Sequence, residues 1–415
     1  MPTSRKQKVR TLPPGVKVWL PVSADSPSEP FPRGHVLLAP DRFRGALTAA
    51  EAARHLAAGL RRTRPDVPVV QLPVADGGDG TVDAAVAAGW RRIEAEVCGP
   101  VGRPVAASLA LAGGVAVVEL AEASGVRRLP GGRPRPLAAT SVGTGQLIGH
   151  ALRRGARRIV LGLGSAACAD GGAGLVRGLG GRLLDSAGRE LPPGGAALRS
   201  LHALDLRGLP DLSGVEVVAA CGPAGPLLGR GGTAAVHGTR GGAGREEVLA
   251  LDAGLRRWAD LAEAATRRTV RDLPGAGAGG GVGFAALAFL GATIAPGPGV
   301  LLDVFGFAER ARAAHLVVTG EGVLDTRSLR GGAPVGVARA AARAGVPVVA
   351  VAGRRGLTGE QLRKARIQAV YTLEDLEPDT ERRVRRAGPL LEQLTVAIAD
   401  EWLPPVRRPG DRTGP

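Results

Sequence analysis

The chain reads VPVVQLPVADGGDGT over residues 67–81, where an apolar run passes directly into a turn of small and acidic residues. Asp76 and Asp79 stand there among glycines, which let a backbone approach a ligand closely. Carboxylates so placed can hold Mg²⁺ or accept a proton. A similar pattern recurs in residues 168–174 (CADGGAG) and 319–325 (TGEGVLD). Each loop alone would be read as an ordinary turn, but the three together predict one phosphate-handling site built from distant segments.

Short apolar runs alternate with helical patterns along most of the chain. Strands are expected at 35–39, 67–74, 158–161, 316–318 and 348–351, with helices between them. This alternation is typical of a parallel sheet covered on both faces. It therefore predicts an α/β fold with a Rossmann-like, doubly wound parallel sheet.

The rhythm changes where extended runs follow one another closely, at 93–97, 105–111 and 115–120. Such spacing indicates antiparallel strands and predicts an inserted second α/β domain. The expected division is a disordered basic, Pro-rich extension at 1–33, a discontinuous Rossmann-like domain at 34–90, 137–187 and 271–403, a second domain at 91–136 and 188–270, and a disordered tail at 404–415.

The charge of the chain is strongly positive, at +16, and is carried almost entirely by arginine. No lysine occurs between Lys17 and Lys364, so arginine or backbone amides must neutralise any phosphate in the body of the protein. The arginines are scattered and are not interleaved with aromatic residues, which make up only 3% of the chain. We therefore expect no specific nucleic-acid binding.

The spacing of the cysteines and the hydropathy of the chain indicate its cellular compartment. Cys98, Cys168 and Cys221 are isolated, with no C-x-x-C spacing, which fits reduced thiols and a cytoplasmic protein. The basic N-terminal stretch lacks an apolar core, so no signal peptide is expected. No apolar run is long enough for a membrane span.

One motif suggests a different class of enzyme. Residues 162–167 (GLGSAA) follow a strand and fit the dinucleotide fingerprint, with Asp185 about twenty residues further on. The match is weak in a chain with 64 glycines, and Asp170 would fall inside the helix that should face the pyrophosphate. An NAD(P)-dependent oxidoreductase is therefore the less favoured alternative, and no P-loop motif occurs.

Taken in order, the loops resemble the glycerate kinase family over about residues 35–400. The segments that carry the resemblance are APDRFR (39–44), VADGGDGT (74–81), ELAEASG (119–125), GTG (143–145), DGGAG (170–174), PGAGAGG (274–280), TGEGVLD (319–325) and APVGVA (333–338). Their order and spacing are similar to those of the family throughout.

The resemblance implies an ATP- and Mg²⁺-dependent kinase that phosphorylates a hydroxyl of glycerate or of a related small hydroxy acid. Catalytic roles are implied for Asp41, Arg44, Asp76, Asp170 and Asp325, and Mg²⁺ binding for Asp76 and Asp79. Nucleotide-binding positions are implied at Gly162, Gly164, Gly171, Gly172, Gly277, Gly279, Gly280 and Glu321. The small-molecule substrate is the expected partner, and a homodimer is left open.

Several polar positions depart from the family pattern. The usual Asp-Ser-Phe-Lys of the first loop is Asp-Arg-Phe-Arg at 41–44, and the usual Gly-Ser-Ala-Thr-Asn loop has lost its polar side chains at residues 166–169. Gly222 stands where the family has an aspartate, and Gly241 and Gly332 stand where it has lysines. A catalytically weakened paralogue with a ligand-binding or regulatory role is therefore a second alternative.

Overall fold

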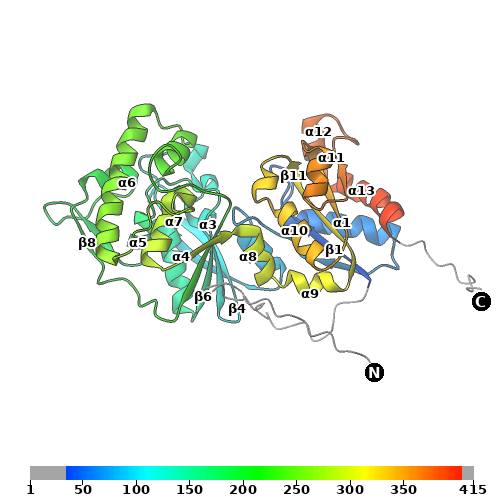
Figure 1. The fold of residues 1–415 in the computed structure, drawn as a ribbon, viewed down its shortest axis with the longest axis horizontal. Helices are drawn as coiled ribbons and strands as arrows, with labels where there is room; N and C mark the ends of the chain where they lie inside the picture. The colour runs from blue at the N-terminus through cyan, green and yellow to red at the C-terminus, as the bar shows by residue number, and fades with distance from the viewer. Residues whose placement is uncertain (1–33, 404–415) are drawn as a thin grey trace, which may run out of the picture.

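The computed structural model describes residues 34–403, so the expected extension at 1–33 and tail at 404–415 lie outside the described residues. The described chain is arranged around two larger sheets that lie side by side along the long axis (Figure 1). We call residues 34–90 and 297–403, around the five-stranded sheet, the first lobe. Residues 91–296, around the six-stranded sheet, are the second lobe.

The sheet of the first lobe is entirely parallel, in the order β13-β12-β11-β1-β2. Its strands are β1 (His35–Pro40), β2 (Val69–Gln71), β11 (Ala314–Leu324), β12 (Val348–Arg355) and β13 (Ala369–Thr372). All six residues of β1 are buried, as expected of a central strand with helices on both faces.

Helices cover both faces of this sheet. One face packs against α1 (Ala49–Thr63) and α13 (Ala387–Trp402). The other packs against α2 (Thr81–Ala87), α8 (Gly297–Val304), α9 (Phe307–Arg312), α10 (Ala333–Arg343) and α11 (Gly359–Lys364). The lobe also contains η5 (Ser328–Arg330) and α12 (Thr380–Arg385). Its first helix begins with a capping box, in which Thr48 and Glu51 each accept a backbone N–H of the other.

The sheet of the second lobe is mixed, in the order β10-β9-β6-β5-β4-β3. Its strands are β3 (Arg91–Cys98), β4 (Pro104–Ala112), β5 (Val115–Glu119), β6 (Arg158–Gly162), β9 (Glu216–Cys221) and β10 (Thr293–Pro296). The first three strands pair antiparallel, whereas β5, β6, β9 and β10 pair parallel. A two-stranded ribbon of β7 (Arg182–Leu184) and β8 (Ala203–Asp205) lies outside this sheet.

The helices of the second lobe cover mainly one face of its sheet. They are α3 (Leu120–Ser124), α4 (Val142–Arg153), α5 (Ala173–Gly178), α6 (Arg245–Thr266) and α7 (Ala278–Phe289), with the short turns η1 (Val126–Arg128), η2 (Pro130–Gly132), η3 (Gly195–Ser200) and η4 (Ala234–Gly238). Trp258 fills the centre of this layer and stacks on Phe289 at 5.4 Å between ring centroids. Within residues 34–403, no helix is both long and apolar enough to cross a membrane.

The opposite face of the second sheet joins the two lobes. Val160, Val218 and Ala220 pack in the same apolar cluster as Leu37 and Val317 of the first sheet, with α2 and α8 among the intervening elements. The lobes therefore share a continuous core, and the loops at their junction are held by packing on both sides.

The α/β class with a second α/β lobe is as predicted, but the strand pairing corrects the expected division of the chain. Residues 137–187 were expected in the first domain, yet β6 pairs with β5 and β9 of the second lobe. Residues 293–296 also belong to the second sheet. Both sheets contain parallel strand–helix units, so the rhythm of the sequence cannot say which sheet a strand enters. The antiparallel run marks one edge of the second sheet.

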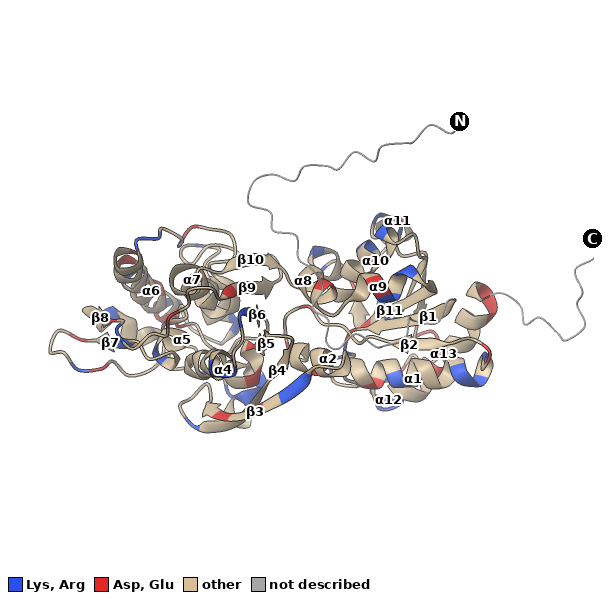
Figure 2. Cartoon of the chain, turned by 90° about the horizontal axis from the view of Figure 1, so that it is seen from below, with Lys and Arg blue, Asp and Glu red and all other residues tan. Residues whose placement is uncertain are grey.

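Charged residues are distributed over both lobes, with Lys and Arg interspersed among Asp and Glu (Figure 2). Many of the arginines pair locally, such as Arg271, which contacts both Asp260 and Glu263. The positive charge of the described residues is therefore spread over both lobes.

Candidate functional site

The carboxyl ends of β1 and β11 meet in the middle of the first sheet. From β1 the chain continues to β2 on one side, whereas β11 pairs with β1 on the other side. Open α/β sheets bind ligands at such a reversal, in the crevice beyond the strand ends. Asp41 leaves β1 here and donates its backbone N–H to the oxygen of Gly320 at 2.8 Å, beside Glu321. Two carboxylates thus stand at the switch point of the sheet.

Asp41, Asp76 and Glu321 form a group that we call the acid cluster. Burial, and secondly the nearby charge of Asp76, raise the pKa of Asp41 to about 8. Burial also raises the pKa of Glu321 to about 7, with smaller contributions from the charges of Asp76 and Asp325. Like charges held together favour a bound cation or a retained proton. The structure therefore brings together carboxylates from three loops that are distant in the sequence.

The acid cluster offers carboxylate oxygens that a hard cation or a substrate hydroxyl can use. Glu321 Oε1 is buried and has no hydrogen-bond partner among the described residues. Mg²⁺ commonly takes one or two protein carboxylates and completes its shell with water and phosphate oxygens. The cluster fits that requirement, although within residues 34–403 no three His, Cys, Asp or Glu side chains form a metal site by themselves.

The loop from Asp76 to Gly80 lies where the two lobes meet. Asp76 Oδ1 accepts the N–H of Gly78 at 2.9 Å, which closes a tight turn. Gly77 has φ of 93°, and a Cβ there would lie 2.7 Å from the oxygen of Ala220 at the end of β9. Its own oxygen accepts the N–H of Gly164, just beyond β6, at 2.9 Å. Only glycine fits between these strand ends.

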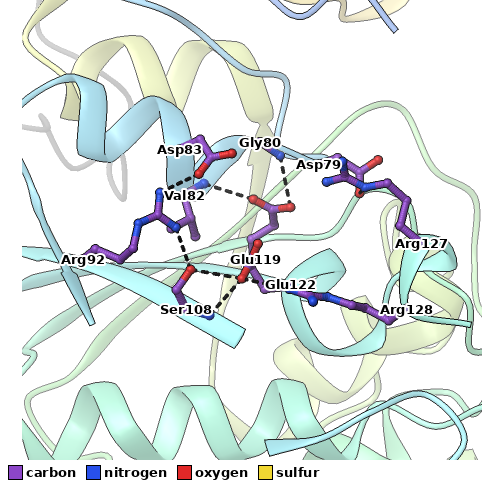
Figure 3. Close-up of polar contacts among 10 residues, drawn as sticks. All are labelled: Asp79, Gly80, Val82, Asp83, Arg92, Ser108, Glu119, Glu122, Arg127 and Arg128. Carbon is purple, nitrogen blue, oxygen red and sulfur yellow. Dashed lines mark hydrogen bonds and ion pairs between the residues drawn. The ribbon is translucent and has the colours of Figure 1, made fainter. Parts of the chain in front are cut away.

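Glu119, at the end of β5, holds the start of α2 from the second lobe (Figure 3). It is 1% exposed, and its two oxygens accept the N–H groups of Gly80 at 3.1 Å and Val82 at 3.0 Å. These bonds replace the side-chain cap that Gly80 cannot provide. Burial raises the pKa of Glu119 to about 8 although the two N–H groups oppose the rise. No role was assigned to Glu119 from the sequence. The feature that could have indicated one is a carboxylate at the end of a buried strand.

Asp79 lies between two arginines, whose charges already compensate its own. Its carboxylate lies 2.8 Å from Arg42 of the first lobe and 3.3 Å from Arg127 of the second. The expected pairing of Asp76 and Asp79 on one Mg²⁺ is therefore not supported, because Asp79 already has cationic partners. Asp76 remains with the acid cluster.

Asp170 has a structural environment, which corrects its expected role as a base or metal ligand. The residue is 1% exposed. Its carboxylate accepts hydrogen bonds from the hydroxyls of Thr140 and Ser141 and from the N–H groups of Ser141, Gly172 and Gly174. Burial raises the pKa of Asp170 in spite of these bonds. The cavity beside it measures about 10 Å³, room for roughly one water. A substrate therefore has no access to this side chain.

The glycines expected to bind nucleotide instead form a close contact between two loops of the second lobe. A Cβ on Gly280 would lie 1.9 Å from the oxygen of Cys168, and one on Gly172 would lie 2.4 Å from Cβ of Ala285. The N–H groups of Gly164, Gly171, Gly172 and Gly277 already donate within the chain. Gly162 is the last residue of β6, and a Cβ there would meet the oxygen of Gly77 at 2.6 Å. Gly279 and Gly280 lie at the start of α7 with left-handed backbones, at φ of 60° and 70°.

Asp325 and Arg44 flank the acid cluster. Asp325 directly follows β11 and pairs with Arg327 at 2.7 Å, and that contact lowers the pKa of Asp325. Arg44 is exposed and follows β1, where its backbone nitrogen would lie 3.2 Å from a Cβ on Gly322. Its charge opposes the rise in the pKa of Glu321. Both residues therefore lie near the cluster, with Asp325 engaged by its own arginine.

The dinucleotide alternative lacks its structural context. The motif at 162–167 follows β6 but does not open a helix, because α5 begins only at Ala173. Asp185 accepts the N–H groups of Ala187 and Arg189 in a local turn. A cavity of about 370 Å³ lies elsewhere in the second lobe, lined by Cys98, Arg177, Arg182 and Glu190 among others, and none of the acid cluster borders it.

Two of the departures from the family pattern lie close together in space. Gly331 directly precedes Gly332, and a Cβ on Gly331 would be 3.8 Å from Cα of Gly222, across the junction of the lobes. A Cβ on Gly222 would meet nothing within 4 Å, whereas one on Gly332 would lie 2.8 Å from Cα of Ser328. The chain thus has open space at the first position and a tight turn at the second.

Comparisons with known proteins identify the relatives of this chain. The sequence profile of the glycerate kinase family matches residues 36–403. A glycerate kinase of Bacillus subtilis is 39% identical over 88% of this chain and 96% of its own length. A glycerate 2-kinase of Escherichia coli is 40% identical over 77% of this chain and 84% of its own. A crystal structure from Salmonella typhimurium LT2, provisionally assigned as glycerate kinase 2, superimposes with a TM-score of 0.77 at 37% identity, covering 89% of this chain and 98% of that one.

The fold and the acid cluster define a two-lobed α/β enzyme of the phosphotransferase class. The chain belongs to the glycerate kinase family.

Proposed function

We propose that this protein transfers the γ-phosphoryl group of ATP to a hydroxyl of glycerate or of a closely related small hydroxy acid, with Mg²⁺. The observation that carries the proposal is the acid cluster at the switch point of the first sheet. Family membership supports the substrate class, since relatives with well over a third of their residues identical carry the name glycerate kinase.

Glu321 is our candidate for the residue that accepts the proton of the attacking hydroxyl. Its pKa of about 7 lies near neutrality, where a general base is most effective. Its buried Oε1 has no donor among the described residues, so a hydroxyl could occupy that position. By contrast, Asp41 Oδ1 already accepts the N–H of Arg42 at 2.7 Å.

Asp76 and Asp41 are our candidate ligands for Mg²⁺, and Arg44 is the candidate cation beside the transferring phosphate. Bound Mg-ATP supplies the phosphoryl group and much of the charge neutralisation that phosphoryl transfer requires. The chain would contribute mainly orientation of the hydroxyl and a fixed electrostatic environment. Gly279 and Gly280, at the start of α7, are the remaining candidates for backbone contacts with nucleotide phosphates.

A cytoplasmic location is proposed on the state of the thiols. Cys98, Cys168 and Cys221 are all free. Burial raises the pKa of Cys221 to about 11 and that of Cys168 well above its usual value, so both thiols stay protonated. Unpaired cysteines are usual in a reducing compartment.

A coupled assay of ADP release with purified protein, Mg-ATP and glycerate tests the function directly. We expect ADP release that depends on both glycerate and Mg²⁺, with a phosphoglycerate as the product by phosphorus NMR. ADP release that does not respond to glycerate, or no release at all, would overturn the proposal.

A further inference from the structure

Arg127 lies on the second lobe but reaches toward the loop that carries Asp76 and Asp79 (Figure 3). It belongs to η1, a short turn whose Val126 donates its N–H to the oxygen of Ser165 at 3.0 Å. Ser165 itself has a left-handed backbone, with φ of 57°, in the loop after β6. The backbone of Arg127 is therefore anchored to the second lobe, while its side chain approaches the junction.

The charges around Asp79 do not balance. One carboxylate lies between two guanidinium groups, with Arg42 at 2.8 Å and Arg127 at 3.3 Å. The Arg42 side chain is 16% exposed and that of Asp79 is 9% exposed, whereas the Arg127 side chain is 66% exposed. The three side chains carry a net charge of +1, and that surplus is most accessible at Arg127.

The contact between Arg127 and Asp79 is incomplete. Asp79 Oδ1, the atom that Arg127 approaches, has no hydrogen-bond partner among the described residues. The guanidinium of Arg127 is thus close enough for an ion pair but donates no hydrogen bond to a described acceptor. Arg128, the next residue, instead donates to Glu122 at 3.4 Å. The planar fork of Arg127 remains available for an oxyanion, which it can bind through two parallel N–H groups.

The position of Asp79 relative to Arg127 is fixed from the second lobe. Glu119 holds the N–H groups of Gly80 and Val82, directly after Asp79, with a buried carboxylate. Glu119 precedes α3, and η1 follows that helix within a few residues, so one short segment supports both the loop and Arg127. The acid cluster lies at the other end of the same loop, through Asp76.

We propose that Arg127, together with Arg42, binds the carboxylate of the hydroxy acid and determines specificity for an anionic substrate. This inference rests on the proposed function. A small acid held by its carboxylate beside Asp79 would extend its hydroxyl toward Asp76 and the rest of the acid cluster. Asp79 keeps the two arginines in place before the substrate arrives. A nucleotide phosphate is the other oxyanion that could occupy the same fork, and the experiment separates the two.

The test compares Arg127→Gln with the matched control Arg128→Gln, using glycerate and glycerol as acceptors with Mg-ATP. Glycerol replaces the carboxylate by an uncharged CH₂OH group. Loss of a charge-assisted contact should raise the KM for glycerate by about 10-fold or more. The preference for glycerate over glycerol in kcat/KM should fall by a similar factor, because only glycerate carries the charge that Arg127 recognises. The KM for ATP should stay within about twofold.

The control should keep the wild-type preference, because Arg128 pairs with Glu122 away from Asp79. Calorimetric titration of glycerate gives a second readout that needs no turnover, and Arg127→Gln should weaken that binding. An unchanged preference in Arg127→Gln, an equal loss in Arg128→Gln, or a change confined to the KM for ATP would overturn the inference. Wild-type protein that binds glycerate through Arg127 but releases no ADP would sink the proposed function alone.

Discussion

Two buried aspartates follow strands in the two lobes, Asp41 in the first and Asp170 in the second, and their surroundings differ. The Asp170 carboxylate receives hydrogen bonds from two hydroxyls and three backbone N–H groups. Asp41 receives the N–H of Arg42 and faces the charges of Asp76 and Glu321. The network around Asp170 is complete, so it holds structure. The cluster around Asp41 has surplus negative charge, so it needs a ligand.

This difference has a general consequence for carboxylates in glycine-rich turns. The pattern of small residues around an acid fixes a tight backbone in both lobes. The chemistry then depends on the donors that other segments bring to the carboxylate, such as the hydroxyls of Thr140 and Ser141.

The largest expected effect is on stability, in Asp170→Asn. The amide NH₂ would face N–H donors where the carboxylate now accepts them, leaving buried groups without partners. We expect the free energy of unfolding to fall by about 3 kcal/mol, within the range for breaking a buried charged network. Urea unfolding followed by circular dichroism measures this.

Asp185→Asn is the control for that experiment, because Asp185 sits in a surface turn with Arg189. Its loss of stability should be about 0.5 kcal/mol or less. If Asp170→Asn unfolds like wild type and loses only turnover, Asp170 would be catalytic and our structural assignment would be wrong.

The next effect is on activity, in Glu321→Gln. The change keeps the shape of the side chain and removes a base, so kcat should fall by about 10² or more. Stability should stay within about 1 kcal/mol, because the variant also removes repulsion from Asp76 and Asp325. Steady-state ADP release and urea unfolding give the two numbers, with Glu381→Gln on the exposed face of α12 as control. A fully active Glu321→Gln would exclude Glu321 as the proton acceptor.

A pH dependence is expected from Glu119. Burial holds its pKa at about 8 in the folded protein, above the ordinary value of 4.5. The folded state therefore binds this proton more tightly than the unfolded chain. The resulting stabilisation is complete below the ordinary pKa and is lost as pH rises toward 8.

Free energies of unfolding measured across that range should decline more steeply with pH in wild type than in Glu119→Gln. The variant carries no titrating proton at this position, so the difference between the two curves isolates Glu119 from Asp41 and Glu321. Parallel curves for wild type and Glu119→Gln would contradict the raised pKa.

The smallest expected effect is on stability, and it distinguishes Gly332 from Gly222, two glycines that depart from the family pattern. Gly332→Lys places a Cβ 2.8 Å from Cα of Ser328, so we expect a loss of about 1 kcal/mol or more. Gly222→Asp enters open space and should change stability by about 0.5 kcal/mol at most. Thermal unfolding of the two single variants decides this. Equal stabilities would show that the turn at Ser328 relaxes freely.

The sequence predicted the α/β class and the parallel strands. It also predicted one site from three acidic loops; the loops of Asp76 and Glu321 lie near each other, whereas Asp170 has a separate hydrogen-bond network. It placed β6 in the wrong sheet, because a parallel strand looks the same in either lobe. It also assigned Asp170 to catalysis, because hydroxyls that satisfy the carboxylate come from residues about thirty positions away. The roles of Glu119 and Arg127 depend on contacts across the junction of the lobes. No local pattern contains such contacts.

The central claim is that the acid cluster, and not the Asp170 network, carries out phosphoryl transfer. Asp76→Asn tests it most directly, because Asp76 contributes charge to both Asp41 and Glu321 and its Oδ1 oxygen can still accept the N–H of Gly78. Glycerate-dependent ADP release should fall by about 10² or more at saturating Mg-ATP, with the unfolding midpoint close to that of wild type. Asp76→Asn protein that releases ADP at the wild-type rate would contradict the account.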